Sequence, residues 1–382
     1  MCMVQHEQTA TPWFDPDFRP SPPEEPYFDP TSGAWILSRY TDVVAALRES
    51  ALHLASPQGE TFPDGEDEME RSRQFAQVRA EIASMGTDKW RTEAKDIADR
   101  VICDAMGKQQ IDLLEDIALP WCVGILLAMS GAAQQYAERI SDLAACLLYK
   151  DAPSATSQQM RPPARFPLTR RFPFNHDAEA QLDQMLERKD LVLSKPMFLA
   201  VSQTLPSFLT KSWLALLHNP AQALRLREAP KLIAGAVDEL IRYAGIVHTL
   251  YRKAHSDVAV AGIQVSKGEL LALKVASANF DPARFSAPYR LDVARRPAGQ
   301  LGLGSGLHAC IGAASVRCAF AVLTPPFLNA GLILDRNQDI VWLGKSTMRR
   351  PLAVYAKLSG LSQPQGLRPR NAVDGGEPIS QN

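Results

Sequence analysis

A glycine-rich loop that ends in a cysteine carries the strongest chemical signal in the sequence. The segment Leu301–Gly312 holds four glycines, and Cys310 stands directly before the helix predicted for residues 313–323. Glycines let backbone amides approach a side chain closely, and a helix N-terminus favours negative charge. We therefore expect the Cys310 thiol to have a low pKa and to act as a thiolate ligand for a metal centre.

A simpler interpretation of the same loop is a glycine-rich turn that ends in a buried cysteine. Two other functions of glycine-rich loops are disfavoured, because the segment lacks the Gly-Lys-Ser/Thr signature of a phosphate-binding loop and does not follow a strand, as a dinucleotide-binding loop does. There is no CxxC pair, and four of the six cysteines lie in apolar helical patterns, where small buried side chains are usual: Cys103, Cys122, Cys146 and Cys318.

Helices dominate the elements that must position this loop. Apolar side chains recur with a helical period through residues 90–106 and 111–129. The sequence predicts further helices at 176–190, 195–218, 221–229 and 231–243, and short strands at 34–40, 258–265, 332–334 and 341–343. A further element, of a type left open, begins at 270–273. The predicted fold class is therefore mainly α with small β-sheets (α+β).

Composition limits the classes of function. Hydrophobic residues make up 46% of the chain and the formal net charge is −1, without the basic stripe that nucleic-acid binding needs. No apolar run approaches the ~20 residues that cross a bilayer, and the first residues carry no targeting signal, so we expect a cytoplasmic protein that binds no membrane. We expect an extended lead-in at residues 1–25, a single domain at 26–360, a mobile loop at 151–175 and a disordered tail at 361–382.

The cysteine loop resembles the haem-binding loop of the cytochrome P450 family, whose pattern is Phe-Gly/Ser-x-Gly-x-His/Arg-x-Cys-x-Gly followed by Ala-Arg. The departures are Leu303 in place of Phe and Val316 in place of Ala, and the matching residues are Gly304, Gly306, His308, Cys310, Gly312 and Arg317. The resemblance is to the soluble bacterial members and extends over residues 26–357. It implies a P450-like fold that binds haem b, with Cys310 as the thiolate ligand of the iron.

The resemblance also implies residues that hold the haem propionates. Arg252 pairs with one propionate, and His308 contacts the other. Arg79 is retained from a helix that usually offers a His and an Arg to the propionates, whereas Phe75 replaces the His. One propionate contact of the family is therefore missing here.

A pair of opposite charges lies upstream of the loop. Glu239 and Arg242 share one face of the helix predicted for residues 231–243, and by itself such a pair is usually a surface contact of little energy. In the family the pair is buried with a second arginine from a later loop, and Arg290 stands at the matching place. We expect Glu239, Arg242 and Arg290 to clamp the fold behind the Cys310 loop and to take no part in the chemistry.

The oxygen-binding helix departs most from the family pattern, which is Ala/Gly-Gly-x-Asp/Glu-Thr-Thr/Ser. The equivalent residues are 200–205, where Thr204 is retained, the glycine is Val201 and the acid is Gln203. Residues 191–218 contain no Asp or Glu at all. A glutamine cannot donate and regain a proton as a carboxyl group does. Thr204 and Gln203 are the catalytic candidates, and either Gln203 is a tolerated polar replacement whose role passes to water or the chemistry differs from the family's.

A proline next to this helix segment and a set of neighbouring residues define the expected substrate pocket. We expect Pro206 to kink the helix and to open a water pocket near Thr204. His248 either bonds to nearby backbone or recognises the substrate. The pocket residues that the resemblance implies are Val201, Gln203, Thr204, Val247, His248 and Thr249.

The resemblance implies a monooxygenase that inserts an oxygen atom from O2 into a small or medium apolar molecule in secondary metabolism. Electrons come from a separate ferredoxin or flavodoxin. The missing acid keeps a second hypothesis open, a haem-thiolate enzyme with other chemistry, such as peroxide-driven oxidation, oxidative coupling, rearrangement or dehydration. A third hypothesis is a degenerate family member that binds a ligand or partner without catalysis.

Overall fold

The computed structural model describes residues 15, 18–60, 76, 78–80, 82–83, 88–130, 136–149, 178–187, 193–296, 298–344 and 347–359. Phe75, the expected mobile loop at 151–175 and the expected tail at 361–382 lie outside these residues, as does much of the lead-in at 1–25. The single-domain boundaries therefore stay a prediction.

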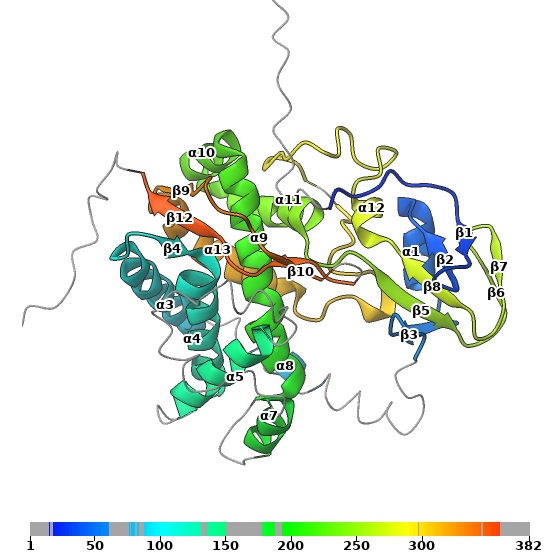
Figure 1. Cartoon of the computed structure of the whole chain (residues 1–382), viewed down its shortest axis with the longest axis horizontal. Helices are drawn as coiled ribbons and strands as arrows, with labels where there is room; N and C mark the ends of the chain where they lie inside the picture. The colour runs from blue at the N-terminus through cyan, green and yellow to red at the C-terminus, as the bar shows by residue number, and fades with distance from the viewer. Residues whose placement is uncertain are drawn as a thin grey trace, which may run out of the picture.

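A bundle of helices forms one side of the molecule, on the left in Figure 1. Its helices are α3 (Asp88–Met106), α4 (Leu119–Ser130), α5 (Ala137–Tyr149), α7 (Ala178–Leu186), α8 (Lys195–Leu199), α9 (Leu205–His218), α10 (Pro220–Glu228), α11 (Ile233–Ala244) and α13 (Ala313–Asn329). Two π-helical turns, η1 (Leu113–Ala118) and η3 (Ala200–Thr204), lead directly into α4 and α9. The predicted helix at 111–129 is thus η1 and α4 together, and the one at 195–218 is α8, η3 and α9.

Helix α9 lies at the centre of this bundle. Every residue from Leu205 to Leu216 is buried, and the helix packs against η1, α4, α10 and α11. Trp213 stacks on Phe327 of α13 with ring centroids 4.6 Å apart. Because no side of α9 faces water along these residues, a polar side chain on it is unfavourable unless it is hydrogen-bonded, and within the described part of the chain the hydroxyls of Thr210 and Ser212 have no partner.

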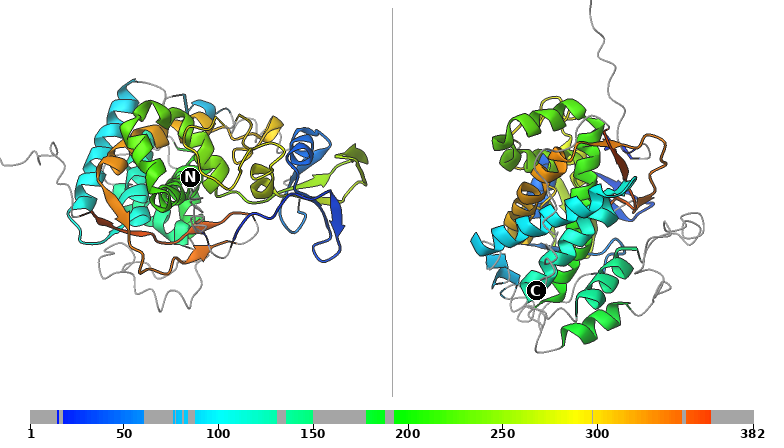
Figure 2. Two further views of the ribbon diagram at one scale, coloured as in Figure 1. Left: turned by 90° about the horizontal axis from the view of Figure 1, so that it is seen from above. Right: turned by 90° about the vertical axis from the view of Figure 1, so that its left-hand side faces the viewer.

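A five-stranded sheet forms the other side of the molecule, and the two parts lie side by side along the long axis in the left view of Figure 2. The strand order is β1-β2-β8-β5-β3, in which only β2 and β8 are parallel. The strands are β1 (Tyr27–Asp29), β2 (Ala34–Leu37), β3 (Leu52–Ala55), β5 (Leu250–Ala254) and β8 (Leu270–Leu273), with α1 (Tyr40–Arg48) and α12 (Val275–Asn279) packed beside them.

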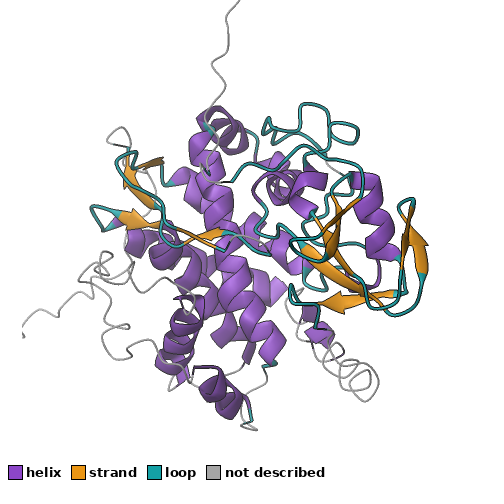
Figure 3. Ribbon diagram, turned by 45° about the vertical axis from the view of Figure 1, so that its right-hand side comes forward, coloured by secondary structure: helices purple, strands orange, loops and turns teal. Residues whose placement is uncertain are grey.

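Three smaller sheets complete the described elements, as the strand colouring in Figure 3 shows. Strands β6 (Val258–Val260) and β7 (Ile263–Val265) form a hairpin, β10 (Trp342–Leu343) pairs with β11 (Arg350–Pro351), and β12 (Tyr355–Leu358) lies between β4 (Ile111–Asp112) and β9 (Leu332–Leu334). The mainly α architecture with small sheets confirms the fold class predicted from the sequence.

One helical stretch of the described chain is long and apolar enough to cross a membrane. This stretch, Leu113–Ser130, comprises η1 and α4, and 61% of it is buried inside the protein. Burial of this kind is what a core helix shows, and length and composition alone are weak evidence for a membrane span.

Candidate functional site

Cys310 lies in a tight loop between the short 3-10 helix η5 (Gly306–His308) and α13. Its N–H donates to the carbonyl of Leu303 at 2.7 Å and closes the loop. Gly304 and Gly306 have φ of +73° and +74°, which other residues adopt only with strain. A Cβ on Gly306 would also come within 2.7 Å of the carbonyl oxygen of Leu47. The glycines are therefore what allows the chain to present this sulfur, which is exposed.

The pKa of the Cys310 thiol contradicts the expectation from the sequence. Although the residue reaches solvent, the protein atoms around the sulfur desolvate it and raise the pKa of the thiol, and the opposing effects of the Gly312 N–H and Arg317 are smaller. The helix N-terminus therefore does not make a thiolate by itself. A coordinating metal ion deprotonates a thiol outright, so a thiolate at this position would depend on a bound metal ion.

Arg317, near the start of α13, forms an ion pair with a carboxylate on α11. Its Nη2 lies 2.7 Å from Oδ1 of Asp238 on α11, and its Nε lies 3.1 Å from Oδ2 of the same carboxylate. Bidentate pairs of this kind fix orientation as well as distance. Asp238 was not identified from the sequence, because its partner lies 79 residues away.

Arg252 on β5 provides the test of whether a haem fits the site. The residue is only 2% exposed, its Nη1 donates to the neighbouring Tyr251 carbonyl, and its Nε has no partner. Within the described part of the chain no carboxylate pairs with it, and burial lowers its pKa to about 10. A buried guanidinium without an anion is unfavourable, so a propionate is the kind of group that this position fits.

The other residues assigned to the haem lie at the surface of the described protein. His308 on η5 is exposed, and so is Arg79 in the short helical piece 78–80. Neither position tests a propionate contact. The roles of His308, Arg79 and the loop glycines in haem binding therefore stay predictions.

The helix that carries Thr204 is irregular where Pro206 enters it. The N–H of Leu205 bonds to the carbonyl of Ala200, five residues back, which makes the turn π-helical. Pro206 has no N–H for the carbonyl of Ser202, so a widened turn just before it is a physically reasonable response. The irregularity is a π turn within a continuous helical run, and the water pocket near Thr204 stays a prediction.

The side-chain amide of Gln203 is held in place by hydrogen bonds to two other residues. Its Nε2 donates to the carbonyl of Ala144 on α5 at 3.1 Å and to the hydroxyl of Ser202 at 3.1 Å. The amide therefore ties η3 to α5. Thr204 is half-buried, and Val201 is 4% exposed.

His248 lies in a buried polar cluster, which neither interpretation of the sequence had suggested. Its ring is 4% exposed, its Nε2 lies 3.2 Å from Nζ of Lys211, and it stacks on Phe18 at 3.9 Å between centroids. Val247 and Thr249 flank it, half-buried and buried respectively. Val247 and His248 line one cavity beside Lys211, and the assignment of Val247, His248 and Thr249 to a substrate pocket stays a prediction.

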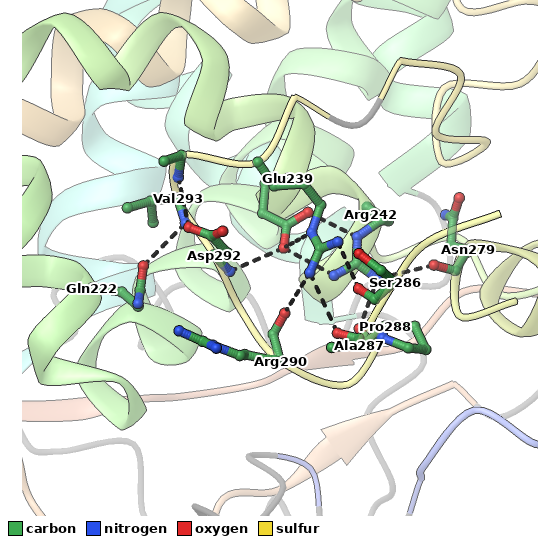
Figure 4. Close-up of polar contacts among 12 residues, drawn as sticks. Gln222, Glu239, Arg242, Asn279, Ser286, Ala287, Pro288, Arg290, Asp292 and Val293 are labelled. Carbon is green, nitrogen blue, oxygen red and sulfur yellow. Dashed lines mark hydrogen bonds and ion pairs between the residues drawn. The ribbon is translucent and has the colours of Figure 1, made fainter. Parts of the chain in front are cut away.

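Glu239 and Arg242 form a fully buried ion pair, with both side chains at 0% exposure and Nε to Oε2 at 2.8 Å (Figure 4). The third arginine is Arg295, whose Nε lies 3.1 Å from Oε1 of Glu239. The expectation of Arg290 is wrong: its side chain is exposed, and only its backbone carbonyl enters the network, as an acceptor from Arg295. The loop from Ala287 to Arg295 turns back on itself, so the residue that reaches Glu239 lies five positions later than simple counting predicts.

No family model matches the chain. The biotin biosynthesis cytochrome P450 of Bacillus subtilis is 22% identical over 313 residues, which are 74% of this chain and 79% of that protein. Cytochrome P450 CYP107DY1 of Priestia megaterium is 28% identical over 278 residues, 68% of this chain and 67% of that protein. Cytochrome P450 CYP199A2 of Rhodopseudomonas palustris is 39% identical over 93 residues, 24% of this chain and 23% of that protein.

Solved structures show the same fold. P450BioI in complex with an acyl carrier protein superposes with a TM-score of 0.65 at 20% identity, covering 85% of this chain and 92% of that one. CYP105P1 in complex with filipin I gives a TM-score of 0.68 at 22% identity, covering 90% of this chain and 94% of that one. Sequence relatives and solved structures agree: the chain has the cytochrome P450 fold and is similar in sequence to bacterial cytochrome P450s, which are haem-thiolate monooxygenases with haem b as their cofactor.

Proposed function

We propose that the protein is a cytoplasmic monooxygenase of secondary metabolism that inserts an oxygen atom from O2 into a small or medium apolar molecule. A separate ferredoxin or flavodoxin supplies the electrons. The observation that carries the proposal is the loop before α13, in which glycines with positive φ allow the chain to present Cys310. The named relatives add support, since they include nocardicin C N-oxygenase of Nocardia uniformis, 26% identical over 354 residues that are 83% of this chain and 88% of that protein.

The residues of the chain divide the work of this site. Cys310 would ligate the iron, and Arg252 would neutralise a propionate. When bound, the haem supplies the iron that activates dioxygen, and a thiolate ligand favours cleavage of the O–O bond. Val201 and Val247 would provide apolar contacts for a substrate. Neither side chain can hydrogen-bond to a polar group, so this part of the pocket would favour an apolar region of the substrate.

Proton delivery at this site cannot follow the route of a carboxylic acid. Gln203 donates to Ala144 and Ser202, and the Ser207 hydroxyl donates to the carbonyl of Gln203 at 2.6 Å. Thr204 remains as the hydroxyl with no such contact among the described residues. A proton would therefore pass between Thr204 and water, which a hydroxyl can do as donor and acceptor.

The same observation supports the second candidate function, haem-thiolate chemistry that does not use O2 in the ordinary way. An enzyme driven by peroxide receives the oxygen atom and its protons together, so it has less need of an acid at position 203. Oxidative coupling, rearrangement or dehydration would likewise place different demands on proton delivery.

Turnover stoichiometry separates the two candidates. Ferric protein is first screened against apolar compounds for changes in the haem spectrum, and hits are incubated with NADPH and a surrogate ferredoxin and reductase. The proposal expects equal amounts of NADPH, O2 and oxygenated product, with product in excess of peroxide. Product from hydrogen peroxide without reductant, and none from O2 and NADPH, would favour the second candidate.

Two variants at one position sharpen the test. Gln203→Glu restores the acid, and Gln203→Met removes both the donor and the acceptor of the side chain. Both variants lose the hydrogen bond that the Gln203 amide donates to the Ala144 carbonyl. The monooxygenase proposal expects more product per NADPH from Gln203→Glu than from Gln203→Met. Equal coupling in the two variants would show that no proton passes through this position. Haem-loaded protein that turns over no compound with either oxidant would favour a binding protein.

A further inference from the structure

Lys211 is a buried amine on the same helix as Thr204. The residue is 3% exposed, and Nζ lies 3.1 Å from the Gly245 carbonyl, 3.1 Å from the Arg349 carbonyl and 3.2 Å from Nε2 of His248. These contacts lie on two other segments, one after α11 and one before β11. A single side chain therefore joins three pieces of the fold.

Lys211 and Thr204 lie on nearly the same face of the helical run. They are seven residues apart, which corresponds to about two turns and a rise of about 10 Å. Lys211 is thus placed to set the distance between the helix that carries Thr204 and the two segments that its ammonium group contacts.

What Lys211 holds is a two-segment wall. The N–H groups of His248 and Thr249 donate to the Thr347 carbonyl at 2.8 and 3.3 Å, and the Arg349 N–H donates to the carbonyl of Ile246 at 2.8 Å. Val247 and Met348 are bridge partners within it. We refer to residues 246–249 and 347–349 as the wall.

The His248 ring and the Arg349 side chain make polar contacts within the Lys211 cluster. Val247 lines the same cavity as Lys211 and His248, and Met348 is 44% exposed. Pinning His248 and the Arg349 backbone therefore fixes how far Val247 and Met348 can move.

Charge balance in the cluster comes from the N-terminal segment. Asp15 is 1% exposed and accepts from Nε and Nη2 of Arg349 at 2.6 and 2.8 Å. Burial, Lys211 and Arg349 lower the pKa of His248 to about 2, so its ring stays neutral and Nε2 can accept from the ammonium group. Burial lowers the pKa of Lys211 to about 7, an effect that Asp15 opposes and Arg349 reinforces.

A buried amine is an expensive way to stabilise a core, because an apolar side chain of similar size is often as good. A buried lysine at this position is therefore better explained by the geometry that its contacts impose than by stability. Resting on the proposed function, we propose that Lys211 is a positioning residue: it fixes the wall against the helix that carries Thr204 and so sets the width of the substrate pocket.

The test compares two nitrogen ligands of haem iron that differ by one ring, imidazole and 4-phenylimidazole. Dissociation constants are read from the shift of the haem absorption band in the full-length ferric protein. The variants are Lys211→Met, Asp15→Asn and the control Lys231→Met, a change of the same type at an exposed position on η4 (Pro230–Leu232).

We expect Lys211→Met to bind imidazole as the wild type does and to change the ratio of the two dissociation constants by about fivefold, within the range for residues that couple to a site without touching the ligand. Asp15→Asn should shift the ratio in the same direction, and Lys231→Met should leave it unchanged. A ratio equal to the wild type's in both cluster variants would overturn the proposal. Failure of the wild type to bind haem would instead overturn the proposed function.

Discussion

Replacing Glu239 with glutamine tests the buried clamp behind the cysteine loop. The carboxylate accepts from Arg242 through both oxygens, from Nε of Arg295 and from the N–H of Asp292. Glu239→Gln is nearly isosteric, but it removes the negative charge that pairs with both Arg242, at 0% side-chain exposure, and Arg295, at 15%. We therefore expect loss of stability from charge and hydrogen bonding, without a cavity.

The expected magnitude follows from that burial. Removing one partner of a buried ion pair lowers the free energy of unfolding by about 3–5 kcal/mol. Arg242 keeps its bonds to the carbonyls of Asn279 and Pro288, which places the effect toward the lower end of this range. Against a total stability of about 5–15 kcal/mol, the change should be large.

Urea denaturation followed by circular dichroism measures the effect. The matched control is Asp183→Asn, which breaks the pair with Lys195 at side-chain exposures of 51% and 38% and should cost at most about 1 kcal/mol. Arg295→Ala should destabilise the protein clearly, and Arg290→Ala should change stability by less than about 0.5 kcal/mol. Equal losses for the two arginines, or a loss under about 1 kcal/mol for Glu239→Gln, would refute this account of the clamp.

Three further predictions concern pH and backbone. Because the pKa of Lys211 is about 7 in the folded protein and near 10.5 when unfolded, the unfolded chain binds more protons in this window, so stability should rise between pH 7 and 10, and urea melts of Lys211→Met should lack this component. Asp112 has the opposite sign: burial raises its pKa from 3.8 to about 7, so its contribution to stability should fall between pH 4 and 7, and Asp112→Asn should flatten that slope. Gly306→Ala should cost about 1–3 kcal/mol in stability or weaken haem retention in a gel-filtration assay, because its φ is +74°; full retention and an unchanged melt would contradict the strain argument.

The parts of the fold that follow from local pattern were predictable from the sequence. The apolar period located α3, α4 and the helices from α7 to α11, and the glycine spacing located Cys310. The strand predicted at 34–40 ends at Leu37, because Tyr40 already begins α1. Boundaries of this kind depend on tertiary contacts, such as the bond from the Tyr40 N–H to Asp281.

The parts that the sequence did not reveal depend on residues far apart in the chain. Asp15 and Arg349 meet across 334 positions, and no local motif marks either of them. Arg295 replaces Arg290 because of how one loop turns, which counting along the chain cannot show. The pKa of Cys310 was misjudged because desolvation by the folded loop outweighs the helix terminus.

The spectrum of the ferrous–CO complex tests the central claim most directly. It should be recorded for the wild type, for Cys310→Ser and for the control Cys318→Ser, a half-buried cysteine on α13. The account predicts the red-shifted band of a thiolate ligand in the wild type and in Cys318→Ser, and its loss in Cys310→Ser. A wild type that binds no haem, or a band that survives in Cys310→Ser, would contradict Cys310 as the ligand.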